Sequence, residues 1–450
     1  MEVQEKRKRI YFEKNEILSL MGIFFLGFST AMFSPYAPIW LVRIFNVESY
    51  FILGFTAIIP NFVIIFGTTL WGIAADKFGN KPFVLIGILG SALMYFTLLF
   101  INNAIIFLVI LLLGNILISA QTSNIYSFAT VNSTKNKETI LGEITAMFSL
   151  SWLVSSPLAA FIHDNAYTFS IKWYTSVSFE QLITPDSLNP SNFISVFATA
   201  LSKFFSTELA QNPSQGVQLF IAVVSCVISF IIVLFTKEKK PEKQEQSDKL
   251  KGISKGKITE FMLVFSILMV ITFFQQATSG GFWAYASLFY IDLLQTPAIY
   301  FGYFLVATTG LGIVLSLLLG RITKINGIMI GVVVCTLIQL GVYIIIAVFP
   351  TNSTLGLIVY SFPMYVVSGV FLYSLVSTFS NKLRRSTAYG IYNTVGFSGL
   401  ITIVLLMGFA ADRLPQGIMI LPVFATITSV FPVIFSVILF IHLLRNKALF

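Results

Sequence analysis

The chain has 450 residues, of which 56% are hydrophobic and only 10% are charged. Soluble domains carry about 25% charged residues, so the charge here is too scarce to cover a water-facing surface, and lipid must be the solvent for most of the chain. The net charge of +9 does not indicate a nucleic-acid partner, because the basic residues lie in short segments between apolar stretches. The composition therefore predicts an all-α membrane protein.

The apolar stretches have the length of membrane-spanning helices, which need about 20 mostly apolar residues. The first one follows Lys6, Arg7, Lys8 and Arg9; it is too long for a secretory signal and has no small-residue cleavage site, so it is predicted to be an uncleaved span. Twelve spans are predicted, at 17–42, 50–74, 82–101, 104–128, 139–162, 216–236, 259–290, 296–320, 328–349, 354–379, 386–411 and 417–444.

Two connections between these spans are long. Residues 237–257 are charged and contain no aromatic residue, which is typical of a disordered segment; this linker separates an N-terminal half, 1–236, from a C-terminal half, 258–450. Residues 163–215 form a predicted outer loop, in which 192–209 has an amphipathic pattern. That segment fits a helix in the membrane interface and an ordinary packed loop helix equally well.

The basic residues predict the orientation of the chain. With the N-terminus in the cytoplasm, the cytoplasmic segments hold 24 lysines and arginines and the outer segments hold four. Because cytoplasmic loops are enriched in basic residues, we expect a multi-pass protein of the cell membrane with both termini in the cytoplasm.

The two halves resemble each other at a fixed spacing of 248 residues. Duplicated halves are a common feature of transporters. Four glycines of the first half recur at this spacing in the second, as the pairs Gly54 and Gly302, Gly72 and Gly320, Gly79 and Gly327, and Gly142 and Gly390.

The loop after the second span carries the most specific motif. It contains Gly72, Asp76, Gly79 and Lys81, with Asn80 before the lysine. This pattern resembles the signature between helices 2 and 3 of the major facilitator superfamily, G-x-x-x-D-x-x-G-R-K, with asparagine in place of the arginine. A degenerate copy follows the eighth span, where Gly320, Lys324 and Gly327 occupy the positions of Gly72, Asp76 and Gly79.

The resemblance covers essentially the whole chain, and it implies two pseudo-symmetric six-helix bundles around a central site that opens alternately to each side. It assigns gating to both copies of the loop, with Asp76 near the N-terminus of the eleventh span at 384–386, and a functional monomer is expected. The family's helix 4 arginine is replaced by Asn115, and the proline motif of antiporters is only faintly present around Pro157.

Uncharged polar residues within the spans are candidates for contacts with a small-molecule substrate. A polar side chain facing lipid is costly, so each should point into the protein, either to the solute or to a neighbouring helix. By the resemblance, helices 1, 4, 7 and 10 line the cavity. The candidates are Thr30, Ser34, Tyr36, Asn115, Gln121, Gln275, Gln276, Ser279, Tyr365 and Asn393.

The 19 carboxylates all lie outside the predicted spans or near their ends. Proton-driven transport commonly uses an ionisable residue within the membrane, so this distribution favours a facilitator, or coupling through a peripheral carboxylate such as Glu143 or Asp292. The sequence has no nucleotide-binding or hydrolase motif, only His163 and His442 as histidines, and only Cys226 and Cys335 as cysteines. We therefore expect no enzyme activity, metal or cofactor.

The leading hypothesis is a transporter of a small, uncharged or amphiphilic organic solute, with a facilitator as its favoured form. A proton-coupled drug or metabolite antiporter and a transporter-like membrane sensor are the alternatives.

Overall fold

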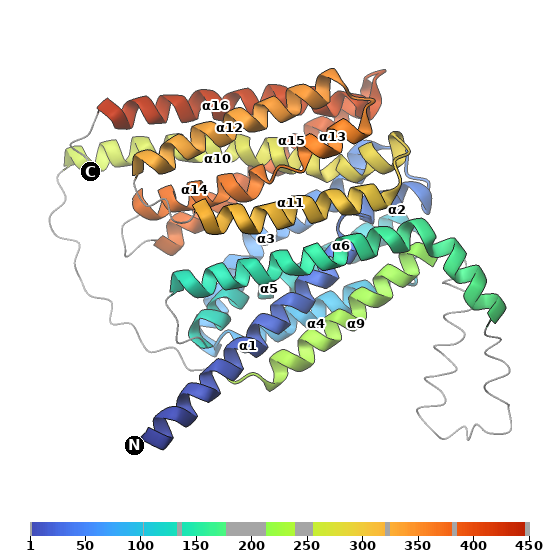
Figure 1. The fold of residues 1–450 in the computed structure, drawn as a ribbon, viewed down its shortest axis with the longest axis horizontal. Helices are drawn as coiled ribbons and strands as arrows, with labels where there is room; N and C mark the ends of the chain where they lie inside the picture. The colour runs from blue at the N-terminus through green and yellow to red at the C-terminus, as the bar shows by residue number, and fades with distance from the viewer. Residues whose placement is uncertain are drawn as a thin grey trace.

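The computed structural model describes residues 2–101, 103–132, 137–176, 213–238, 255–319, 325–379 and 385–445, and these residues are almost entirely helical and contain no strand. They form two bundles, which lie one below the other in Figure 1. The lower bundle, the N-terminal half, consists of α1 (Glu2–Phe33), α2 (Ala37–Arg43), α3 (Tyr50–Phe78), α4 (Lys81–Leu98), α5 (Ala104–Asn132), α6 (Lys137–Ser176) and α9 (Pro213–Phe235).

The upper bundle is the C-terminal half. It consists of α10 (Lys255–Ser287), which continues into a π-helix, η2 (Leu288–Leu293), then α11 (Ala298–Leu319), α12 (Ile325–Val348), α13 (Ser353–Tyr360), α14 (Met364–Phe379), α15 (Arg385–Arg413), the 3-10 helix η3 (Gly417–Ile420) and α16 (Leu421–Arg445). Helices suit this chain because they satisfy their backbone groups internally, which lipid requires of a spanning segment.

Eleven helices in the described residues are long and apolar enough to cross a membrane. The predicted span at 354–379 is divided into α13 and α14 at residues 361–363. Pro363 explains the break, because proline has no N–H to donate and disfavours a helical conformation at the residue before it. The twelve-helix, two-bundle prediction is confirmed, with this span as a broken helix.

The first span is broken near Pro35 and Pro38. Helix α1 ends at Phe33 and α2 begins at Ala37, with Pro38 in its first turn. Helix α6 continues beyond the predicted fifth span to Ser176. The first residues of the predicted outer loop, which begins at 163, are therefore helical. The amphipathic segment 192–209 and linker residues 239–254 lie outside the described residues.

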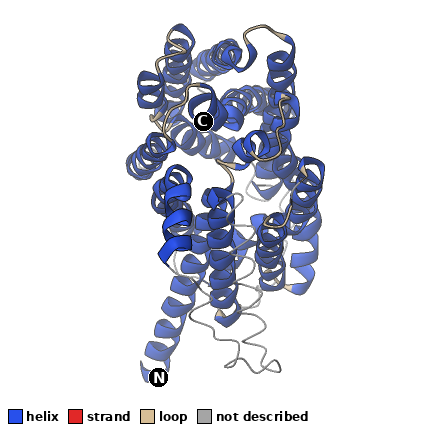
Figure 2. Cartoon of the chain, turned by 90° about the vertical axis from the view of Figure 1, so that its right-hand side faces the viewer, coloured by secondary structure: helices blue, strands red, loops and turns tan. Residues whose placement is uncertain are grey.

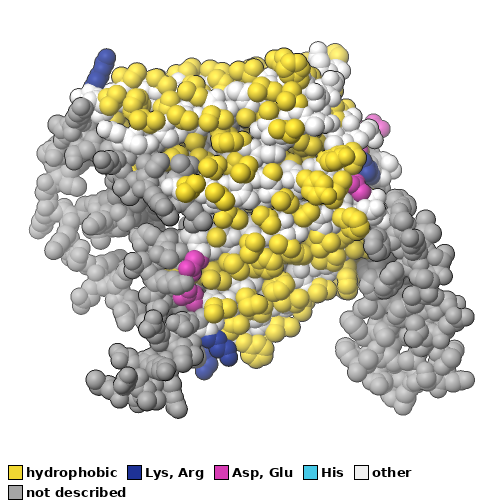
Figure 3. All heavy atoms as spheres, viewed as in Figure 1, with side chains coloured by type: hydrophobic (Ala, Val, Ile, Leu, Met, Phe, Trp, Pro, Cys, Tyr) yellow, Lys and Arg dark blue, Asp and Glu magenta, His cyan; other side chains and the backbone are white. Residues whose placement is uncertain are grey.

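Apolar side chains cover the sides of the two bundles, and charged side chains lie toward the two ends (Figure 3). Phe66 and Leu70 on α3 and Ile105 on α5, for example, are 58%, 68% and 73% exposed, which is costly in water and favourable in lipid. We call the end that carries Arg43, Asp164 and Asp412 the distal end, and the end that carries Lys81 and Glu238 the linker end.

The halves meet along two pairs of helices. Helix α3 packs against α15, and α6 packs against α11, so each half contributes two helices to the seam. Figure 2 views the molecule from the distal end, with the two bundles one above the other.

Candidate functional site

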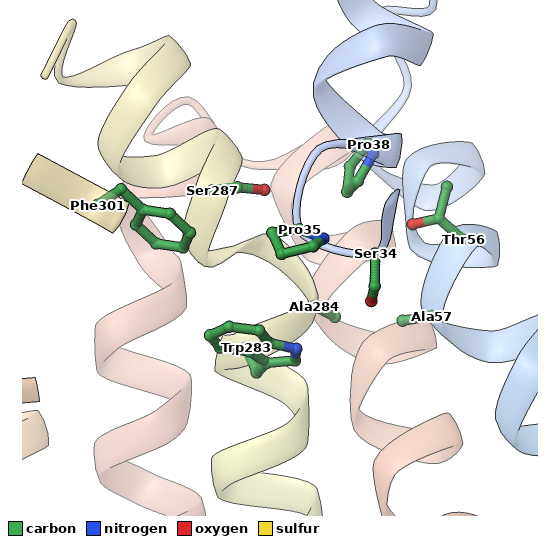
Figure 4. A pocket seen from close by; sticks show the side chains of 9 residues that line it. All are labelled: Ser34, Pro35, Pro38, Thr56, Ala57, Trp283, Ala284, Ser287 and Phe301. Carbon is green, nitrogen blue, oxygen red and sulfur yellow. The ribbon is translucent and has the colours of Figure 1, made fainter. Parts of the chain in front are cut away.

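A cavity of about 40 Å³ lies on the seam between the two halves. Figure 4 shows its lining, which comes from the break between α1 and α2, from α2, and from α3, α10 and α11. The lining residues are Ser34, Pro35, Pro38, Thr56, Ala57, Trp283, Ala284, Ser287 and Phe301. A cavity of this size holds a few water molecules, whereas solute pockets are about 300–1,000 Å³, so this cavity alone is too small for an organic solute.

The cavity combines hydroxyl groups with aromatic rings. Thr56 donates its hydroxyl proton to the carbonyl oxygen of Leu53, at 2.8 Å, which leaves the Thr56 oxygen as an acceptor. The rings of Trp283 and Phe301 lie nearly parallel, with an interplanar angle of 22° and centroids 6.3 Å apart. No charged residue is among the nine that line the cavity, so its chemistry suits an uncharged ligand.

The seam is tightly closed at the distal end. A Cβ added to Gly302 on α11 would lie 2.6 Å from Cβ of Ala160 on α6, and one added to Gly408 on α15 would lie 2.8 Å from Cα of Phe51 on α3. Tyr285 on α10 also reaches across the seam, donating its hydroxyl to the carbonyl oxygen of Tyr50 at 3.1 Å.

The same helix faces are separated at the linker end. Gly72, Gly142 and Gly390 lie 18 residues from Gly54, Ala160 and Gly408 respectively, which is five helical turns, so each pair shares one face of its helix. A Cβ added at any of these three linker-end glycines would meet no neighbouring part of the described chain within 4 Å. The halves are therefore in contact at the distal end and apart at these linker-end positions.

The first span contributes three of the predicted substrate-binding residues, of which Ser34 lines the cavity. Thr30 donates its hydroxyl to the carbonyl oxygen of Leu26 within its own helix. Tyr36 is fully buried, and its ring stacks on His163 with centroids 5.2 Å apart. Thr30 and Tyr36 thus lie outside the lining of this cavity.

The predicted amides of the N-terminal half lie between α4 and α5. Asn115 donates to the carbonyl oxygen of Leu111 at 2.7 Å, and its amide nitrogen lies 3.9 Å from Sδ of Met94. Gln121 donates to the hydroxyl of Ser91 at 3.3 Å. Both amides are buried, and in this conformation they join neighbouring helices of one bundle.

The C-terminal half contains a similar arrangement. Gln275 on α10 is 2% exposed and donates to Oε1 of Gln339 on α12, at 2.5 Å, and to the hydroxyl of Ser368 on α14, at 3.0 Å. Ser279 donates to the carbonyl oxygen of Gln275, and the side chain of Gln276 packs over Gly396 on α15. These three predicted residues also lie outside the cavity lining.

Asn393 is exposed on α15 and accepts a hydrogen bond from the hydroxyl of Tyr373 on α14, at 3.0 Å. Tyr373 is 42% exposed, and it was not among the sequence candidates. The side chain of Tyr365 lies outside the described residues.

Several cavity residues escaped the sequence analysis, among them Thr56, Trp283, Ser287 and Phe301. The sequence candidates for substrate contacts include no residue of α3 or α11, no tryptophan or phenylalanine, and no residue of α10 beyond Ser279. One available signal was the repeat, because Pro35 and Trp283 lie 248 residues apart and both line the cavity.

The predicted gating loop binds the start of the linker and the end of α9. Gly79 ends α3 with a φ of +91°, a conformation that glycine adopts readily. The carboxylate of Glu238 accepts hydrogen bonds from the backbone N–H groups of Asn80 and Lys81, at 2.7 and 3.0 Å. Lys81 in turn donates its ammonium to the carbonyl oxygen of Leu234 at the end of α9, so α4 and α9 are joined at the linker end.

The structure describes only some of the remaining predicted gating residues. Gly327 lies in the first turn of α12. Gly320, Lys324, residue 384 and the side chain of Asp76 lie outside the described residues, so the predicted contact of Asp76 with the N-terminus of α15 stays a prediction.

Solved structures that resemble this one include transporters. The nucleoside transporter NupG is 15% identical over 97% of this chain and 99% of that one, with a TM-score of 0.61. The human organic anion transporter MFSD10 is 14% identical over 95% and 99% of the two chains, with a TM-score of 0.59.

A bacterial homologue of the human lysosomal transporter Spinster, solved in an inward-facing and unoccupied conformation, is 11% identical over 96% of both chains, with a TM-score of 0.67. At these identities the likeness shows the fold. No curated protein matches the sequence.

The family model described as Major Facilitator Superfamily matches residues 19–177 and 191–404. This match takes in most of both halves, and it agrees with the two bundles, the apolar helices and the transporter folds that resemble them. The chain therefore belongs to the major facilitator superfamily and is a multi-pass membrane transporter.

Proposed function

We propose that the protein carries an uncharged organic solute across the membrane by alternating access, with the solute bound on the seam next to the described cavity. The main observation in support is that residues of both halves line this cavity with hydroxyl groups and aromatic rings and with no charged side chain. Among the described residues the halves touch at the distal end and leave open space beside Gly72, Gly142 and Gly390, which supports a path that leads from the cavity toward the linker end.

The chemistry of the lining narrows the class of solute. An organic anion needs a cationic partner or several N–H donors to replace its hydration, and the lining has no lysine, arginine or histidine. Stacked rings and hydroxyl oxygens instead suit a planar ring system that bears hydroxyl or amide groups. A nucleoside is such a compound, so nucleosides are the first probes and organic anions the contrasting ones.

The basic-residue count supports an orientation in which the linker end faces the cytoplasm. In that orientation the structure corresponds to an inward-facing state. The loop at Gly79, Asn80 and Lys81, which Glu238 binds, then belongs to the cytoplasmic gate.

We also propose that the protein works as a facilitator. Uphill transport by proton coupling needs a group that changes its protonation as the site alternates. Asp164, Asp292 and Asp412 lie together at the distal end, Glu143 lies in the second turn of α6, and no titratable carboxyl group lines the cavity. Serine and threonine hydroxyls bind a solute without titrating.

The test combines binding and flux. Thermal-shift measurements with nucleosides, other neutral metabolites and organic anions identify a ligand, and proteoliposomes then measure its uptake. The Trp283→Ala variant should weaken binding by about fivefold or more, as removal of a stacking ring does. Phe66→Ala, which removes a lipid-facing ring that is 58% exposed, is the control.

Three results would argue against this proposal. Binding without uptake would favour a membrane sensor. Preferential binding of organic anions would contradict the solute class. Equal effects of Trp283→Ala and Phe66→Ala on the dissociation constant would place the solute away from the described cavity.

A further inference from the structure

Two aspartates at the distal end each bind the N-terminus of a helix in the opposite half. Asp412, at the end of α15, accepts hydrogen bonds from the backbone N–H groups of Tyr50 and Phe51 at the start of α3, at 2.6 and 3.2 Å. Asp164, on α6, accepts hydrogen bonds from the N–H groups of Ala298 and Ile299 at the start of α11, at 2.9 and 2.7 Å. Each carboxylate thus caps a helix of the other half.

The two caps are copies of one arrangement. Asp164 and Asp412 are 248 residues apart, as are Tyr50 and Ala298, and Phe51 and Ile299. This is the spacing that relates the glycines of the two halves. The donors and the acceptor therefore occupy equivalent positions of the repeat in both copies. The donors to Asp412 lie in the N-terminal half, and the donors to Asp164 lie in the C-terminal half.

Glycines on the same helices let the caps form. Gly54 lies one turn after Tyr50, and Gly302 lies one turn after Ala298. A Cβ at Gly54 would lie 2.9 Å from Val404 on α15, and one at Gly302 would lie 3.2 Å from the carbonyl oxygen of Ser156 on α6. Both contacts would be closer than ordinary packing. Because glycine has no side chain, each helix start can come within reach of its carboxylate.

We propose that Asp164 and Asp412 form a duplicated latch that holds the distal end closed and that both caps must open before the solute path reaches the distal side. The proposal rests on the alternating access proposed above. A carboxylate at a helix N-terminus makes charge-assisted bonds and meets the positive end of the helix dipole. These bonds join the two halves, so their loss lowers the stability of the distal-closed state relative to the open one.

The two caps differ by one side-chain donor, which predicts a difference in strength. Asp412 also accepts a hydrogen bond from the hydroxyl of Ser49, at 2.7 Å, whereas the matching position in the other copy is Pro297, which offers no side-chain donor. The cap at Asp412 therefore has three donors and the cap at Asp164 has two. Loss of Asp412 should open the distal end more than loss of Asp164.

The experiment measures access to the seam from the distal side. A cysteine at Ala57, in the cavity lining, reacts with a membrane-impermeant maleimide added to one side of right-side-out vesicles, and Cys226 and Cys335 are both buried. Asp164→Ala and Asp412→Ala should each raise the rate of labelling from the distal side by about twofold to thirtyfold, the range that follows from the loss of a helix cap.

Two further variants sharpen the measurement. Asp412→Asn should give a smaller increase than Asp412→Ala, because an amide oxygen still accepts one backbone N–H. Glu48 is an exposed residue beside the same cap, and its carboxylate has no hydrogen-bond partner in the described part of the chain. Glu48→Ala should therefore be labelled at the same rate as the protein that carries only the cysteine at Ala57. Reaction of the two native cysteines only after denaturation confirms that each variant is folded.

Equal rates in Asp164→Ala, Asp412→Ala and Glu48→Ala would overturn the latch, and so would the absence of labelling in every variant. The measurement needs no transported solute, so a protein that moves none of the tested compounds still reports on the latch. Conversely, normal flux together with unchanged labelling would leave the proposed transport intact and remove only the latch.

Discussion

Replacing Gly302 with alanine should push the protein out of the distal-closed state. The new Cβ would lie 2.6 Å from Cβ of Ala160 and 3.2 Å from Cα of Pro157, whereas carbon atoms pack best at about 3.5–4.0 Å. Two of the three closest atoms, Cα of Pro157 and the carbonyl oxygen of Ser156, belong to the backbone of α6, so α11 and α6 must separate by roughly 1 Å to relieve the overlap.

Overpacking of this kind costs about 1–3 kcal/mol, which lowers the ratio of closed to open molecules by about five- to 150-fold. Alanine also favours a helix over glycine by about 1 kcal/mol, but that gain is the same in both states and does not change the ratio. Gly54→Ala meets side-chain atoms instead, Oη of Tyr285 and Cγ1 of Val404, and displacement of Tyr285 would break its hydrogen bond to the carbonyl oxygen of Tyr50 across the seam.

The assay is distal labelling of the cysteine at Ala57, together with the rate of solute uptake. Gly390→Ala is the matched control, because it makes the same change on α15 where a Cβ has no neighbour within 4 Å among the described residues. The reasoning about the seam is wrong if Gly302→Ala and Gly390→Ala label at the same rate.

The other predictions concern the gate, the buried amides and the topology. Asp76→Asn should reduce flux strongly while the dissociation constant of the solute changes little, because the loop motif is expected to act in gating; transport at the normal rate would contradict that role. Gln275→Ala should destabilise the protein by about 1–3 kcal/mol, because it leaves Oε1 of Gln339 without its donor, and the melting temperature measures this; a loss of affinity with unchanged melting would place Gln275 in the solute site instead. A cysteine introduced within 237–257 should stay unlabelled by an impermeant reagent outside intact cells, and labelling there would reverse the topology.

The helices were predictable because their signal is long and local. Each span is an apolar run whose length lipid dictates, and Pro35 and Pro38 mark the end of α1 in the sequence itself. The division of α13 from α14 was missed although Pro363 lies within the predicted span. A proline in a membrane helix is tolerated when neighbouring groups bind the freed backbone, so sequence alone does not tell a break from a kink.

The lining of the site was harder to predict, because apolar surroundings require only that a polar side chain point inward. Asn115 and Gln275 meet that requirement by bonding to groups within their own bundles. Which side of a helix faces the seam depends on how the two halves approach each other. Glycines such as Gly54 and Gly302 lie where the helices come closest. An aspartate at a helix end, such as Asp412, looks in sequence like an ordinary solvated charge.

We propose that a neutral solute crosses the membrane by binding on the seam and moving down its own gradient. Uptake of a radiolabelled nucleoside into proteoliposomes, with and without an imposed pH difference, tests this claim most directly. We expect entry until the internal and external concentrations are equal, at a rate that the pH difference leaves unchanged and that Trp283→Ala reduces. Accumulation above the external concentration that an uncoupler abolishes would contradict it and would direct attention first to Glu143.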